Sequence, residues 1–362
     1  MTSDAAALMD GSSWRAFCRA LEQAGDVILD PPSPATELDR AEGFRYLTRL
    51  LRVALEMTVE CADPDFPEFF QASHKTAKIG ADNPDNLYLN AALSPHRSYR
   101  INGSRGTVPI LTFATKANRY AIDGTMASTG ELDARDISIG PDNRIEIIVS
   151  LTRPDDCLNW LPMQADTSFM VVRQTFADRE REQPADLRIT SLQAPRAPQP
   201  LHPEFLAAAL RGASGFVTGT AETFKRWAEM FRASHRNELT TADQTLFQKA
   251  GGDPMIHYLH GYWDIGEDEA LVIESEIPPC RAWNFQLNNY WMESLDYRYH
   301  RIHVNHANAD IDPDGQVTVV VAHRNPGFGN WIDTAGHTHG TMLWRWTGAS
   351  EFPIPRTRVV KL

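Results

Sequence analysis

Histidine side chains gather in the last third of the 362-residue chain, where they could transfer protons. His337 and His339 are two residues apart, so on a strand both side chains project from one face. An imidazole ionises near neutral pH, which suits it to general acid–base catalysis. We expect His337, His339 and His300 to act as acid and base groups. The alternative is a divalent transition-metal site on His337 and His339, which lacks the glutamate that completes a cupin-type ligand set.

A second group of chemistry-bearing side chains lies within residues 291–300. It combines carboxylates, an arginine, phenols and an imidazole, a density that suits acid–base catalysis. We expect Arg298 and Tyr299 to orient or polarise a substrate oxygen. Glu293 and Trp291 are expected to contact the substrate. The alternative is a solvated rim on which neighbouring charges pair with each other.

Two further features could contribute to a substrate site. The polar segment 78–86 has the composition of a turn, which we favour, but Lys78 and Asp82 could also form the lip of a site. Six of the nine tryptophans lie beyond residue 260, which favours a pocket with apolar walls that includes Trp283. A plain sandwich core would use the same tryptophans.

Two stretches of the chain repeat each other at a nearly constant spacing. Pro141–Ser150 matches Pro313–Ala322 at 313 − 141 = 172 residues, and Arg173 matches Arg345 at 345 − 173 = 172. An Asn-Trp pair follows the first segment of each copy. The histidine pair at 337 and 339 has no counterpart in the first copy, which indicates that the second copy is the specialised one. A shared offset over so many residues indicates an internal duplication.

Each copy predicts antiparallel β-structure, because turn residues precede an alternating β-branched run. We predict an α+β protein with duplicated antiparallel β-sandwich or jelly-roll-like units. The expected boundaries are an N-terminal helical region at 1–80, a first β unit at 81–187, a linker with a helical insert at 188–252, and a second β unit at 253–362. The second β unit would hold the active site.

Apolar residues three or four positions apart predict the helices of the chain. They indicate helices over 12–27 and 38–59, followed by a short helix over 66–73. In the insert they indicate one helix that begins at Pro203, a second around 224–231 and a third over 242–250. These helices should pack against one of the sheets.

The charge and the cysteine content of the chain limit the classes of binding partner and the cellular location that we expect. The 47 acidic residues outnumber the 35 basic ones and give a net charge of −12, which disfavours nucleic acid. The four cysteines have no C-x-x-C spacing and indicate reduced thiols. Neither a secretion signal nor a membrane-spanning run is present. We therefore expect a cytoplasmic protein with a small-molecule substrate and neither nucleic-acid nor membrane partner, and leave open whether it forms a homo-oligomer.

Two short motifs carry a family resemblance. Asn159-Trp160-Leu161-Pro162, and Pro278-Pro279 with Arg281-Ala282-Trp283, resemble segments of the bacterial domain-of-unknown-function family numbered twelve-fourteen. The resemblance covers mainly the two β copies. It implies a jelly-roll-like β-sandwich and no assigned activity, cofactor or catalytic set.

The candidate residues together favour one function over two alternatives. We expect a cytosolic enzyme that acts by acid–base proton transfer on a small apolar or aromatic molecule, as a lyase, hydratase or isomerase without an organic cofactor. The enzymatic alternative is a metal-dependent cupin-like enzyme that uses the His-x-His pair. The other alternative is a non-enzymatic jelly-roll binding or assembly module.

Overall fold

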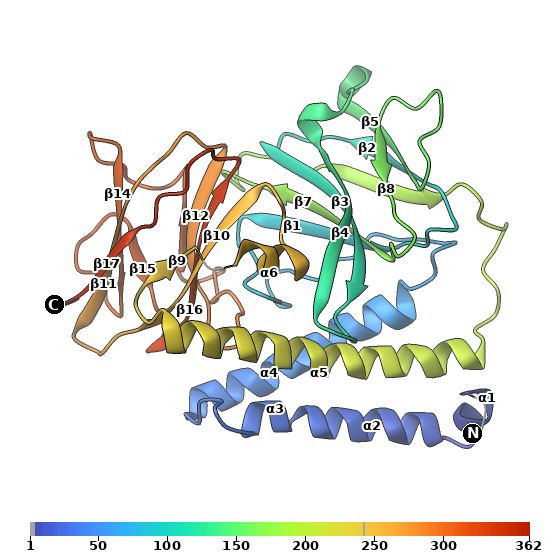
Figure 1. Cartoon of the computed structure of the whole chain (residues 1–362), viewed down its shortest axis with the longest axis horizontal. Helices are drawn as coiled ribbons and strands as arrows, with labels where there is room; N and C mark the ends of the chain where they lie inside the picture. The colour runs from blue at the N-terminus through green and yellow to red at the C-terminus, as the bar shows by residue number, and fades with distance from the viewer. Residues whose placement is uncertain (1–3, 242) are drawn as a thin grey trace.

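Two β units stand side by side over a layer of long helices (Figure 1). The computed structural model describes residues 4–241 and 243–362. The chain opens with four helices, which are α1 (Asp4–Met9), α2 (Ser12–Ala24), α3 (Asp26–Leu29) and α4 (Glu37–Leu55). Thr36 caps α4, because its Oγ1 accepts a hydrogen bond from Asp39 N at 3.1 Å. The helix then ends in a π-helical turn, η1 (Glu56–Glu60).

The first β unit is a sandwich of two four-stranded sheets. Their strand orders are β1-β7-β3-β4 and β6-β5-β2-β8. The strands are β1 (Asn86–Ala92), β2 (Tyr99–Ser104), β3 (Ile110–Arg119), β4 (Thr125–Asp133), β5 (Arg144–Ser150), β6 (Trp160–Pro162), β7 (Phe169–Thr175) and β8 (Asp186–Ser191). Two short 3-10 turns, η2 (Ala134–Asp136) and η3 (Pro141–Asn143), connect β4 to β5.

The second β unit repeats this topology strand for strand. Its sheets have the orders β13-β12-β16-β10-β9 and β15-β14-β11-β17, and only the edge strand β9 (Leu239–Thr240) lacks a counterpart among the described residues. The duplication predicted from the sequence is therefore confirmed. The remaining strands are β10 (Ile256–Asp264), β11 (Glu269–Glu276), β12 (Ala282–Leu287), β13 (His303–Asn305), β14 (Gln316–Ala322), β15 (Trp331–Asp333), β16 (His339–Thr347) and β17 (Arg356–Lys361).

One asparagine in each unit closes the sandwich edge in the same way. Asn159 donates to the carbonyls of Ser138 and Glu146 at 2.9 and 2.8 Å, and accepts from Ser138 N at 2.7 Å. Asn330 makes the matching bonds to Asp310 and to Thr318 O. The repeated Asn-Trp pair is thus an architectural element shared by both copies.

Three helical predictions need correction. The two helices expected from 203 to 231 are one continuous helix, α5 (Pro203–Ser234), whose glycines allow close packing. A side chain at Gly219 would collide with the Tyr120 carbonyl. No helix forms over 66–73, because Pro67 interrupts the segment and Phe70 instead bridges to β1 at Asn90. The helix expected over 242–250 is α6 (Gln244–Lys249), and residue 242 lies outside the described residues, as do residues 1–3.

The helices cover the junction between the two β units. Helices α4 and α5 pack on each other, and their apolar faces form a core of their own with aromatic side chains from both units. Each sandwich has a separate core between its sheets. Every helix within residues 4–241 and 243–362 is too short or too polar to span a bilayer. All four cysteines are free, and Cys18 is exposed.

Candidate functional site

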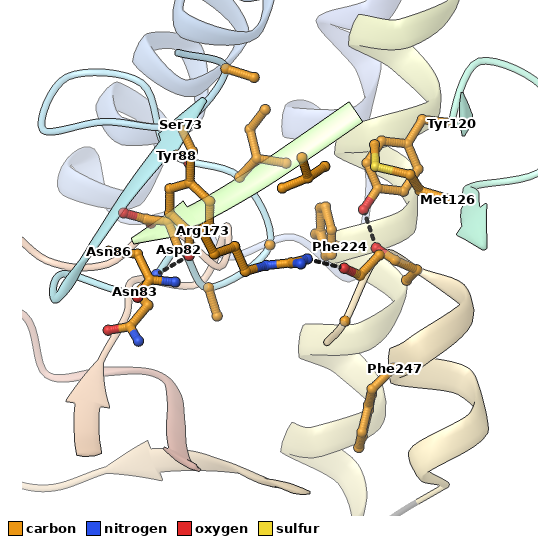
Figure 2. A pocket seen from close by; sticks show the side chains of 18 of the residues that line it. Ser73, Asp82, Asn83, Asn86, Tyr88, Tyr120, Met126, Arg173, Phe224 and Phe247 are labelled. Carbon is orange, nitrogen blue, oxygen red and sulfur yellow. Dashed lines mark hydrogen bonds between the residues drawn. The ribbon is translucent and has the colours of Figure 1, made fainter. Parts of the chain in front are cut away.

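A cavity of about 170 Å³ lies where the two β units meet helices α5 and α6 (Figure 2). Its walls come from the loops that precede β1 and β10, from strands β1, β7, β10 and β16, and from the two helices. Most of the lining side chains are apolar, among them Met57, Phe169, Val171, Phe224, Trp227 and Phe247. Apolar walls with a few polar groups are typical of sites that bind small organic molecules.

Two buried arginines, one from each β unit, donate hydrogen bonds to a loop of the opposite unit. Arg173 on β7 donates to Gly251 O at 2.6 Å, in the loop that precedes the second unit. Arg345 on β16 donates to Ala81 O, in the loop that precedes the first unit. Because 251 − 81 = 170 and 345 − 173 = 172, the two contacts are equivalent in the duplicated units. Each unit thus binds, through its arginine, the loop that precedes the first long strand of the other unit. The cavity lies between these two loops.

Two equivalent tyrosines support these loops. Tyr88 Oη accepts from Asn83 N at 3.0 Å, and Tyr258 Oη accepts from Asp253 N at 2.8 Å. Burial raises the pKa of Tyr258 to about 12. Its phenol is therefore neutral at physiological pH and lines the cavity as a polar but uncharged group.

Four buried polar atoms that line the cavity have no hydrogen-bond partner among the described residues. They are Ser73 Oγ, Asn86 Oδ1, Arg173 Nη1 and His260 Nδ1. A buried polar group without a partner costs about 1–3 kcal/mol, so such groups are uncommon in folded proteins. Their residues all border one cavity, which makes this cavity the candidate site for a ligand.

His260 lies in an aromatic box at the edge of this cavity. Its ring stacks on Phe231, with centroids 4.8 Å apart, and contacts Phe247 at 4.4 Å. Burial, with a smaller contribution from the charge of Arg345, lowers the pKa of His260 well below its ordinary value. The imidazole is therefore neutral at pH 7, and its unprotonated nitrogen can accept a hydrogen bond.

Asp82 connects the cavity to a buried polar network. Its carboxylate accepts from Ser294 N at 3.0 Å and from Ser294 Oγ at 2.9 Å. Burial raises the pKa of Asp82, although the neighbouring Lys78 opposes that shift. Lys78 is buried as well: its ammonium donates to Leu295 O at 2.7 Å, and burial lowers its pKa. Of these two residues, Asp82 lines the cavity.

The predicted histidine pair contacts two carboxylates on helix α4. His337 Nε2 lies 2.8 Å from Glu42 Oε2, and His339 Nε2 lies 3.3 Å from Asp39 Oδ2. Burial alone would raise the pKa of Glu42, but the hydrogen bond and charge of His337 outweigh it and lower that pKa. Burial likewise disfavours the charged form of His337, yet the same pairing raises its pKa. The two side chains therefore form a buried ion pair when His337 is protonated.

Glu293 and Trp291 join the same network. Arg49 Nη1 donates to Glu293 Oε1 at 2.6 Å, and Asn289 Nδ2 bridges Glu293 and Glu42 at 3.1 and 2.9 Å. Trp291 Nε1 donates to the carbonyl of Asp39 at 3.1 Å. Six of the ten predicted site residues thus meet in a buried junction between α4 and the loops around 78–82 and 289–295, namely His337, His339, Glu293, Trp291, Lys78 and Asp82.

The other four predicted residues lie elsewhere. The side chain of Tyr299 is 79% exposed, and Arg298 pairs with Asp296 at 2.6 Å near the surface. His300 is half-exposed and lies 2.7 Å from Asp333 Oδ2. Trp283 stacks on Trp344 at 4.9 Å within the core of the second sandwich. Arg298, Tyr299 and His300 therefore lie at the surface, where the solvated-rim alternative placed them.

His337 and His339 do not lie on one strand. β16 begins at His339, and His337 lies in the preceding loop, so the two rings do not share a strand face. The segment 288–301 is irregular, so strand alternation does not apply to it. Among the described residues, no three His, Cys, Asp or Glu side chains group so that they could hold a metal ion. The geometry therefore lends no support to the cupin-like alternative.

The sequence analysis missed the cavity residues Arg173 and His260 and the carboxylates of α4. One signal for Arg173 was present, because the arginine recurs at the matching position of both copies. A charged residue kept within a buried strand of each copy indicates a shared polar contact. His260 had no such signal, since only the tertiary packing of α5 and α6 places it beside the cavity.

Comparisons with known proteins support the fold and family. A crystal structure of an uncharacterized protein from Burkholderia cenocepacia superimposes with a TM-score of 0.96, at 50% sequence identity and 99% coverage of both chains. The VPA0106 protein from Vibrio parahaemolyticus shares the fold, with a TM-score of 0.52, 11% identity and coverage of 94% of this chain and 100% of that one. Residues 266–351 match the model of the family described as "Protein of unknown function (DUF1214)". No curated protein matches the sequence.

Proposed function

The chain belongs to the DUF1214 family, and we propose that it is an enzyme that moves a proton on a small, largely apolar or aromatic molecule bound in the central cavity. The reaction would be of the lyase, hydratase or isomerase type and would need no organic cofactor. We further propose a cytoplasmic location, which the four free cysteines support. The acid–base role predicted for His337, His339 and His300 passes to His260 in this proposal.

The observation that carries the proposal is the unpartnered imidazole of His260. Its Nδ1 is buried without a hydrogen-bond partner among the described residues, and its ring lines the cavity. In this proposal the neutral ring takes a proton from a ligand C–H while the electron pair stays on the ligand. Burial and Arg345 lower the pKa of His260 and disfavour the imidazolium, so the negative charge left on the adjacent ligand would have to stabilise it. The proton then returns at another atom in an isomerase, or a leaving group departs in a lyase.

The size of the cavity limits the substrate. A cavity of about 150 Å³ holds a benzene molecule, so the 170 Å³ cavity suits a compact ligand with a single ring. The aromatic side chains around it favour a flat or branched apolar body. His337 and His339 are occupied by carboxylates of α4 and contribute to the architecture of the junction instead.

Hydrogen–deuterium exchange tests the proposed proton transfer. A panel of small aromatic and branched ketones with acidic C–H groups is incubated with the protein in D₂O, and loss of the C–H signal is followed by NMR. The variant His260→Phe keeps the stacked ring but removes the base. We expect protein-dependent exchange of at least one compound, slowed about a hundredfold in His260→Phe.

The same experiment distinguishes the proposed enzyme from a non-enzymatic binding module. Binding of panel compounds without any exchange would support the non-enzymatic binding module and contradict the enzyme. Exchange at equal rates in both proteins would contradict the role of His260. A panel that neither binds nor exchanges would contradict the cavity as the functional site.

A further inference from the structure

The duplication provides an internal comparison for each arginine that borders the cavity. Arg173 and Arg345 occupy the same register, since Arg173 pairs with Thr112 on β3 and Arg345 pairs with Asn284 on β12. Two residues further along these strands stand Ala114 and, in the second unit, Gln286. Side chains two residues apart on a strand share a face, so both positions border the arginine of their own unit.

In the second unit these neighbours bind the arginine. Arg345 Nη1 donates to Gln286 Oε1 at 2.5 Å and to Asn284 Oδ1 at 3.3 Å. Its Nη2 donates to the carbonyl of Ala81. Both terminal nitrogens of Arg345 therefore have acceptors from the chain itself.

In the first unit the same two positions supply no acceptor to the arginine. Ala114 has no polar side chain, and the hydroxyl of Thr112 donates to Asp253 Oδ2 at 3.2 Å. Arg173 Nη2 is bound to Gly251 O, but Nη1 has no hydrogen bond among the described residues, and its nearest carboxylate oxygen, on Asp253, is 3.6 Å away. The side chain of Arg173 is about nine-tenths buried.

Arg173 lines the cavity, and Nη1 is the end of its guanidinium that has only the longer contact with Asp253. Arg173 extends from β7 across the cavity towards the loop at Gly251, between the side chains of Tyr88 and Phe224 (Figure 2). The charged groups of the lining are two guanidinium groups and one carboxylate, Asp82. Asp253 lies behind Arg173 and balances part of its charge. The site therefore accepts a neutral or an anionic oxygen at Nη1.

We propose that Arg173 Nη1 binds a hydrogen-bond-accepting oxygen of the ligand, so that the substrate class is small aromatic or branched carbonyl and carboxylate compounds. This inference rests on the proposed function, because it assigns the polar end of a ligand whose apolar body fills the same cavity. The first unit has no Asn or Gln at these positions, so Arg173 Nη1 is available to the ligand oxygen. An arginine at that place also stabilises negative charge that develops on the oxygen when a neighbouring C–H loses its proton.

Three probes of similar shape test the assignment. Isopropylbenzene has no acceptor, acetophenone has a neutral carbonyl, and benzoate has a carboxylate. Their dissociation constants for the wild-type chain are measured by ligand-observed NMR. A hydrogen bond to a charged donor strengthens binding about tenfold or more, so we expect acetophenone or benzoate to bind at least tenfold more tightly than isopropylbenzene.

A matched pair of variants ties this preference to Arg173. Ala114→Gln supplies the acceptor that the second unit already has at this position, and Ala114→Met fills similar space without an oxygen. We expect Ala114→Gln to abolish the preference for the oxygen-bearing probe and Ala114→Met to retain it. Thermal unfolding confirms that each variant is folded. If Ala114→Gln does not fold, Arg173→Met takes its place and should also abolish the preference, because methionine has no N–H donor.

The outcomes separate this inference from the proposed function. Equal binding of all three probes would overturn the role of Arg173 and leave the cavity as an apolar binding site. A preference that survives in Ala114→Gln would also overturn it. Failure of all three probes to bind would contradict both the proposed function and the inference.

Discussion

Glu42 and His337 are 295 positions apart in the chain, yet Glu42 Oε2 and His337 Nε2 lie 2.8 Å apart in a buried contact. The contact fastens helix α4 to the loop that precedes β16, and Asp39 and His339 make a second contact one helical turn away. A buried ion pair is sensitive to pH through both partners. The attachment of the helical layer to the second β unit should therefore depend on pH.

The sign of this dependence follows from the two pKa shifts. The pKa of His337 is raised above 6.5, so its contribution is complete below pH 6.5 and is lost as the pH rises through the raised value. The pKa of Glu42 is lowered below 4.5, so its contribution is present above pH 4.5 and is lost as the pH falls through the lowered value. The pair contributes most between about pH 4.5 and 6.5. The stability that His337 adds, measured by urea unfolding as the difference between the wild type and His337→Gln, should be smaller at pH 8.5 than at pH 6.

His337→Gln is the control for this pH dependence. Glutamine can still donate to Glu42 but does not titrate. The variant should therefore lose more unfolding free energy relative to the wild type at pH 6 than at pH 8.5. An unchanged difference would mean that other groups cause the loss of stability.

Removal of one partner should be strongly destabilising. Glu42→Ala leaves His337 and Asn289 without their buried acceptor, and such losses cost about 3 kcal/mol. Glu22→Ala, at an exposed position on α2, should change the unfolding free energy by less than about 0.5 kcal/mol. Denaturant unfolding at pH 6 compares the two variants. A similar small effect in both would show that the pair adds nothing to stability.

The sequence predicted the architecture better than the site for a physical reason. The repeat, the turn residues and the alternating strands are local patterns, and they were sufficient to predict the duplicated sandwich. The contact between His337 and Glu42, and the box around His260, depend on how α4 and α5 pack across both units. Nothing near residue 260 in the chain indicates that Phe231 will stack on it. Side chains such as Tyr299 looked chemically suitable but lie on the surface, where local composition cannot place them.

The two sandwich asparagines should have equal importance if the duplication preserved their role. Each makes three hydrogen bonds to backbone groups of its own unit. Replacement by alanine leaves those groups without partners, so Asn159→Ala and Asn330→Ala should each cost about 3 kcal/mol of unfolding free energy. Chemical denaturation monitored by tryptophan fluorescence measures both losses. A large loss in one variant and none in the other would contradict a common role.

Access to the cavity should pass between Ser73 and Asn86. Both residues line the cavity and also a surface groove of about 760 Å³, and each has a buried oxygen without a partner among the described residues. Movement of these oxygens therefore breaks no hydrogen bond. Val171→Cys places a thiol in the cavity wall, and its labelling by methyl methanethiosulfonate, followed by peptide mass spectrometry, reports entry of a small reagent. In the Val171→Cys background, the additional substitution Ser73→Leu should slow labelling about tenfold, because leucine fills the passage. The control substitution Ala250→Leu, at a position that lines the cavity beside Tyr120, should not slow it. Equal labelling rates in the two double variants would place the passage elsewhere.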